Sequence, residues 1–147
     1  MKFYRSKRGG GFAVEFGPAL FVILIMFLIP AINFVQMGLV YCCGWYANHV
    51  ATREAACAGP TKAQAAADSA VQAWASTGLD SLIHAPVPTN TVVCPTGQDI
   101  DGDGKPDFCQ CTTVVKATPF FPMPWLTASQ VTFQYSDLRP IEEKGLN

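Results

Sequence analysis

Charged residues are scarce in this chain of 147 residues, and they are unevenly placed. They make up 14% of the sequence, and none occurs from Phe16 until Arg53. So low a charged fraction is unusual for a freely soluble domain. Beyond Gly10, eleven acids face six bases, which gives a formal charge of −5. Because nucleic-acid binding needs a basic face on the folded domain, this balance argues against a nucleic-acid partner.

Catalytic and zinc-binding patterns are missing as well. Histidine occurs only at His49 and His84, with no nucleophile or carboxylate in a recognisable relation to either. The six cysteines form neither a CxxC motif nor a paired zinc pattern. We therefore expect no enzyme activity. We expect disulfides instead, and hence an oxidising compartment such as the periplasm.

A long apolar run near the N-terminus predicts a membrane helix. Phe16 to Ile32 contains no charged or strongly polar residue, and Asn33 and Gln36 interrupt the run only mildly. The apolar stretch, about residues 16–40, reaches the roughly 20 residues that a bilayer core requires. Four basic residues precede it, which predicts a cytoplasmic N-terminus and a periplasmic remainder. The run is too long for a cleaved secretory signal, and no small-x-small site closes it.

The segment RGGGFAVEF, residues 8–16, adds a more specific signal. A carboxylate at the mouth of a membrane helix, here Glu15, is costly unless it is paired, so we expect it to be functional. A basic leader, a glycine, four residues, and then Glu and an aromatic residue resemble the processing site of type IV pilin relatives. The similarity is strongest to the TadE-like minor pilins of the tight-adherence (Tad) branch, and it covers about the first 50 residues.

The resemblance implies that a prepilin peptidase cuts between Gly10 and Gly11. Glu15, followed by Phe16, would then be the fifth residue of the mature chain and would neutralise the new amine of a neighbouring subunit. The implied function is that of a structural or assembly-priming minor pilin or pseudopilin of a Tad-like pilus. Its partners would be other pilin subunits, the assembly machinery and inner-membrane lipid. The alternative is an uncleaved, membrane-anchored periplasmic module that binds or senses calcium, with Glu15 merely reaching toward water.

The rest of the chain predicts an α+β fold with a small head. After a basic leader (1–10), one long helix should occupy residues 11–58, bent at Pro18 and Pro30 and ended by Gly59-Pro60. The head, residues 59–147, should contain a second helix and a three-stranded antiparallel sheet. The expected elements are a helix over Pro60 to Thr77 and strands over Thr89–Cys94, Cys111–Ala117 and Gln130–Tyr135.

Aromatic residues and prolines alternate in the segment from Thr118 to Leu126. This composition predicts a stiff loop. It either covers the edge of the core or presents a contact surface to another subunit.

The acidic stretch DIDGDGKPD, residues 99–107, predicts a calcium loop. Oxygen ligands at alternate positions, with a glycine where the backbone must turn, suit a hard cation such as Ca²⁺. Position twelve of an EF-hand would be Glu but is Gln110 here, so the loop instead resembles the nine-residue loops of extracellular repeats. A solvated acidic turn is the alternative. The expected ligands are Asp99, Asp101, Asp103, the carbonyl of Lys105, and Asp107.

Cysteines flank this loop on both sides. A disulfide from Cys94 to either Cys109 or Cys111 would clamp its base, and the spacing does not choose between them. Cys57 would then pair with the remaining member of that couple, or with Cys42 or Cys43 of another subunit.

Overall fold

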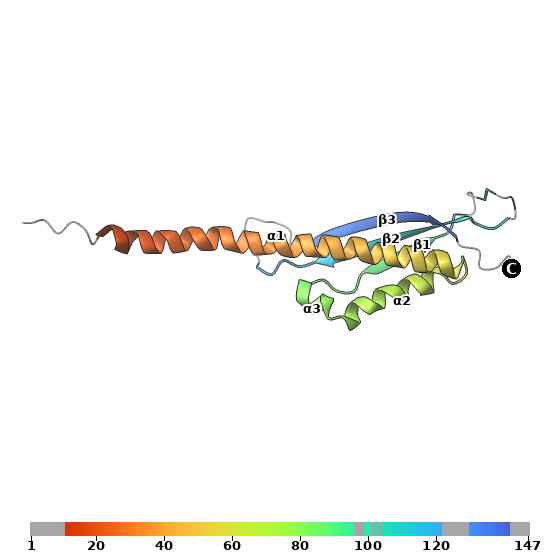
Figure 1. The fold of residues 1–147 in the computed structure, drawn as a ribbon, viewed down its shortest axis with the longest axis horizontal. Helices are drawn as coiled ribbons and strands as arrows, with labels where there is room; N and C mark the ends of the chain where they lie inside the picture. The colour runs from red at the N-terminus through yellow and green to blue at the C-terminus, as the bar shows by residue number, and fades with distance from the viewer. Residues whose placement is uncertain (1–10, 96–98, 101, 103, 122–129, 142–147) are drawn as a thin grey trace, which may run out of the picture.

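The computed structural model describes residues 11–95, 99–100, 102, 104–121 and 130–141. Within those residues the chain forms three helices followed by three strands (Figure 1). The fold is therefore α+β, as the sequence predicted. The elements are α1 (Gly11–Ala58), α2 (Ala63–Ser76), α3 (Leu79–Ile83), β1 (Thr89–Val93), β2 (Phe108–Ala117) and β3 (Val131–Pro140).

Helix α1 is unbroken over 48 residues, or about 70 Å, and carries both Pro18 and Pro30 inside it. Its N-terminal half projects away from the other elements (Figure 1). The helix ends at Ala58 because Gly59 takes a left-handed conformation, with a φ of 75°, which stops the helical hydrogen-bond pattern. The predicted end at Gly59-Pro60 is thus confirmed.

The projecting half of α1 is apolar on every side. Every side chain from residue 16 to residue 28 is exposed. An 18-residue window in this helix has a mean hydropathy of 2.5, with 6% of it buried. Exposing apolar surface to water costs about 25 cal/mol per Å², so this half of α1 is unfavourable in water. By its length and composition, helix α1 is long and apolar enough to cross a membrane.

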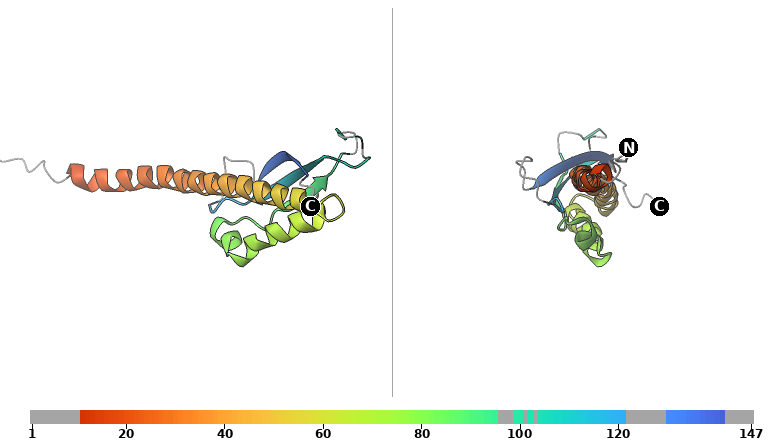
Figure 2. Two further views of the ribbon diagram at one scale, coloured as in Figure 1. Left: turned by 45° about the vertical axis from the view of Figure 1, so that its right-hand side comes forward. Right: turned by 90° about the vertical axis from the view of Figure 1, so that its left-hand side faces the viewer.

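The sheet has the order β1-β2-β3, and both pairings are antiparallel. It covers one side of the C-terminal half of α1, and α2 covers another (Figure 2). The odd-numbered residues of β2 face α1 and are mostly buried, whereas Gln110 and Lys116 lie exposed on the outer face. This alternation is what a sheet with one buried face requires.

Two strands are longer than predicted, and one helix was missed. β2 begins at Phe108 because its first residues pair with the end of β3, where Phe108 lies opposite Pro140. For the same reason, β3 continues to Pro140, beyond its predicted end at Tyr135. The short helix α3 was not predicted.

The core consists of two neighbouring clusters along α1. One contains Val40, Trp74, Ile83, Val115 and Tyr135, with other apolar residues. The second lies nearer the end of α1 and combines the alanines of α1 and α2 with two thiols. Because the α1 side chains in this second cluster are small, the sheet and α2 can approach the helix closely. Its members are Ala51, Ala55, Ala63, Ala67, Val71, Cys109 and Cys111.

Candidate functional site

The residues expected at the processing site lie at the start of α1 or before it. Gly10 is outside the described residues, and so is the rest of the leader. Gly11 is the first residue of α1. Glu15 follows one turn later, although its side chain is outside the described part. Phe16 is 52% exposed. The proposed cut and the pairing of Glu15 both remain predictions.

Two polar side chains in the apolar run attach the head to α1. Asn33 and Gln36 are almost fully buried, with exposed fractions of 4% and 2%. The Gln36 amide donates to the carbonyls of Ile83 (2.9 Å) and Thr118 (2.8 Å). Its oxygen accepts from the backbone N–H of Phe120 at 2.9 Å. One side chain thus bonds three backbone groups of the head.

Asn33 makes the matching contacts one turn earlier. Its amide donates to the carbonyl of Phe121 at 2.9 Å, and its oxygen accepts from the N–H of Phe121 at 3.2 Å. Residues 33 and 121 are 88 positions apart, so the sequence analysis treated Asn33 and Gln36 as mild interruptions and missed this role. We call these five hydrogen bonds the amide clamp. It fixes the place on α1 where the bare helix ends and the head begins.

The described part of the acidic loop is held in a curl by hydrogen bonds to its own carboxylates. The two carboxylate oxygens of Asp99 accept from the N–H groups of Gly102 (2.6 Å) and Gly104 (2.8 Å). Both glycines have positive φ, 78° and 81°, so the backbone curls around Asp99. The Asp107 carboxylate accepts from the N–H of Ile100, which brings the two ends of the loop together.

The described residues include only some of the expected calcium ligands. Asp101 and Asp103 lie outside the described residues, and Lys105 is exposed. Among the residues that are described, no group of three or more His, Cys, Asp or Glu side chains could hold a metal. The calcium site therefore remains a prediction.

The cysteines near the loop occupy one face of the sheet. Continuing the register one step beyond Val93 and Gln110 places Cys94 opposite Cys109. Burial, together with a hydrogen bond to Cys94, raises the pKa of the Cys109 thiol to about 12. Burial also raises the pKa of Cys111, which is hydrogen-bonded to Thr113 and Thr52 instead. No disulfide joins Cys94, Cys109 or Cys111 in the structure. Cys57 is half-buried near the end of α1.

A polar cluster joins α1 to the end of β3. Nη2 of Arg139 lies 3.0 and 2.9 Å from the two ring nitrogens of His49, and Asp137 lies 3.8 Å from the same ring. Trp45 stacks on the ring of His49, with the ring centroids 5.6 Å apart. These side chains border a cavity of about 310 Å³, together with the buried Asn48. Because 90 positions separate His49 from Arg139, the cluster could not be predicted from the sequence.

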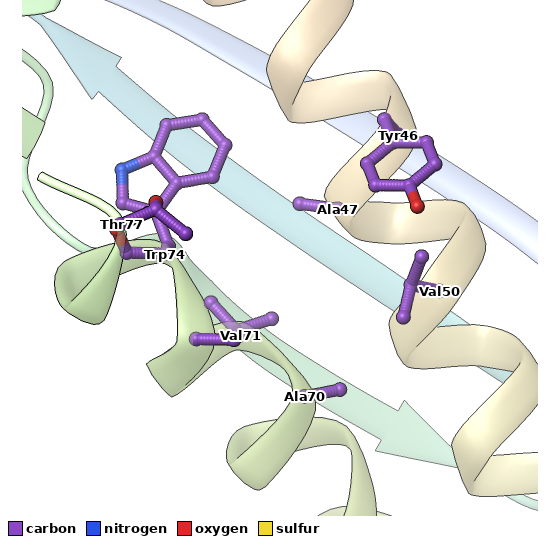
Figure 3. Close-up of a pocket in the computed structure, with 8 residues that line it drawn as sticks. Tyr46, Ala47, Val50, Ala70, Val71, Trp74 and Thr77 are labelled. Atoms are coloured by element: carbon purple, nitrogen blue, oxygen red, sulfur yellow. The ribbon is translucent and has the colours of Figure 1, made fainter. Parts of the chain in front are cut away.

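A second, apolar cavity of about 240 Å³ lies between α1 and α2 (Figure 3). Tyr46 and Val50 border it from α1, and Val71 and Trp74 from α2. The buried indole N–H of Trp74 has no hydrogen-bond partner among the described residues. Apart from Tyr46, Trp74 and Thr77 the lining consists of alanine and valine side chains, so the cavity lies within the apolar packing of α2 on α1.

Comparisons of the chain with family models, with curated proteins and with solved structures give no match. The functional argument therefore rests on the chain's own residues. Three features carry it: the bare apolar half of α1, the amide clamp, and the loop around Asp99.

Proposed function

We propose that this chain is a structural or assembly-priming minor pilin or pseudopilin of a Tad-like pilus, related to type IV pili. One observation supports the proposal above the others. Helix α1 is bare and apolar over its N-terminal half and serves as the spine of the head over its C-terminal half. One helix thus combines a membrane anchor with the scaffold of a periplasmic domain.

This division of α1 suits a subunit that leaves the bilayer to join a filament. The bare half must be covered by lipid or by other apolar helices, because its exposed side chains include Phe21, Phe27 and Phe34. Copies of the same helix can replace the lipid when subunits assemble. Glu15 would then neutralise the amine of Gly11 on a neighbouring subunit, inside that apolar packing.

The proposed orientation places the leader in the cytoplasm and the head in the periplasm, where disulfides persist. The acidic loop connects β1 to β2 at the end of the molecule farthest from the N-terminal half of α1 (Figure 1). Calcium held by Asp99, Asp101, Asp103, the Lys105 carbonyl and Asp107 would neutralise this loop. A disulfide between Cys94 and Cys109 would close its base.

Processing provides the experiment. Co-expressed with the prepilin peptidase of its host, the chain should lose ten residues and begin at Gly11, as intact mass measurement would show. Gly10→Glu should prevent the cut while leaving the membrane helix unchanged, and wild-type chain expressed without the peptidase is the control. A chain that keeps its first residues beside an active peptidase would refute the pilin assignment.

The second candidate is an uncleaved, membrane-anchored periplasmic calcium module. The orientation of the Asp99 carboxylate by two backbone N–H groups favours it specifically, since a binding loop needs no filament. The mass measurement separates the two functions, because only the pilin requires cleavage.

A further inference from the structure

A shallow apolar groove lies where the bare half of α1 meets the head. Its volume is about 260 Å³. Helix α1 forms one wall, up to Leu39, and Phe120 forms the other. These two residues are 81 positions apart in the chain. The lining residues are Ala31, Ile32, Val35, Gln36, Leu39 and Phe120.

The amide side chain that lines this groove is fully paired. Gln36, the one amide in the lining, uses its nitrogen twice and its oxygen once within the amide clamp. The N–H of Thr118 bonds the carbonyl of His84 at 3.2 Å, and Pro119 has no N–H to satisfy. Asn33 and Gln36 together bond the N–H groups of Phe120 and Phe121 and the carbonyls of Thr118 and Phe121. Most backbone polar groups of the segment 118–121 are thus bonded within the protein, which lowers the cost of placing this segment beside hydrocarbon.

The position of the groove along α1 also suits a place at the edge of the hydrocarbon core. From Phe16 to Leu39 the helix measures about 36 Å, slightly more than the roughly 30 Å of a hydrocarbon core. The next exposed aromatic residues on α1 are Tyr41, Trp45 and Tyr46, at 53%, 56% and 65%. Tyrosine and tryptophan gather at the membrane–water interface. The groove thus lies on the lipid side of this aromatic group.

We propose that the groove holds an acyl chain of a phospholipid in the periplasmic leaflet, so that the head is partly embedded in the bilayer and does not merely stand above it. The inference rests on the membrane-spanning part of the proposed function. The lining offers neither an unpaired donor nor a charge, which disfavours a polar ligand. Val35 in the lining is 65% exposed and its neighbour Phe34 is 74% exposed, so the apolar surface of the groove continues into the bare half of α1.

Photo-cross-linking of the full chain in vesicles of phosphatidylethanolamine and phosphatidylglycerol tests this placement. The photoreactive residue p-benzoyl-phenylalanine would replace Phe120, which is 38% exposed and belongs to the head. Ile23, in the bare half of α1, is the positive control. Leu138, 46% exposed on the outer face of the sheet, is the negative control within the head. Mass spectrometry would measure the adducts.

We expect phospholipid adducts at positions 120 and 23, each several-fold more abundant than at position 138. Adducts at position 23 alone would overturn the groove proposal and leave the membrane span intact. Lipid adducts at neither position would overturn both. A chain-to-chain adduct at position 120 in place of lipid would show that a second copy fills the groove, which also refutes the proposal.

Discussion

At Gly44, α1 packs closely against the sheet. A Cβ atom at this position would lie 2.7 Å from Cε2 of Tyr135 and 3.0 Å from Cγ2 of Val115. Neither neighbour is free to move, because Tyr135 is 8% exposed and Val115 is fully buried. The hydroxyl of Tyr135 also donates to the carbonyl of Tyr41 at 3.0 Å, which fixes the ring in place. Gly44→Ala should therefore force the helix and the sheet apart.

Two opposing free energies decide the sign of this change. Replacing glycine by alanine inside a helix normally stabilises it by about 0.5–1 kcal/mol. Overpacking a buried contact costs about 1–3 kcal/mol, and losing the hydrogen bond of Tyr135 costs about 1 kcal/mol more. The net expectation for Gly44→Ala is a loss of about 1–3 kcal/mol. At roughly 4–8 °C per kcal/mol for a domain of this size, the melting temperature should fall by about 5–20 °C.

Gly38 supplies the matched control on the same helix. No described atom apart from its own helical neighbours lies within 4 Å of a Cβ built at this position, so Gly38→Ala should keep only the favourable helix contribution. Thermal unfolding of the three chains in one detergent, followed by near-ultraviolet circular dichroism, measures both effects. A Gly44→Ala chain that melts at or above the wild-type temperature would refute the close packing of α1 on Tyr135.

Three further outcomes are expected. Glu15→Ala should leave membrane insertion intact but abolish incorporation into sheared filaments, and unchanged recovery would exclude a role in assembly. Saturating Ca²⁺ should raise the melting temperature relative to chelator, by the equivalent of about 2.7 kcal/mol at 100 times the dissociation constant. Asp101→Ala combined with Asp103→Ala should abolish that difference. The exported chain should carry a disulfide that Cys94→Ser removes, at a cost of about 3 kcal/mol for a 15-residue loop, and peptide mapping that pairs Cys94 with Cys111 would contradict the register.

The sequence alone determined the properties that depend on neighbours along the chain. Helix α1 and its end follow from an apolar run without helix-breaking clusters and from Gly59-Pro60, because helical hydrogen bonds join residues only four apart. The α+β class follows from the change of pattern after Gly78. The sharp turn at Gly104 was predicted for the same reason, since it depends on the glycine itself, whose φ is 81°.

Tertiary structure decided everything that joins distant residues. Spacing left Cys94 open to Cys109 or Cys111, and only the pairing of β1 with β2 places it opposite Cys109. The lengths of β2 and β3 were set by each other, not by their own β propensity.

The amide clamp is the clearest example of such a long-range decision. In the sequence alone, Asn33 and Gln36 are only mild interruptions of an apolar helix. They become necessary once the segment 118–121 folds back across 82 to 88 positions and presents backbone groups that need partners. A buried polar group is stable only when its partner is present, and here the fold of the head brings that partner to α1.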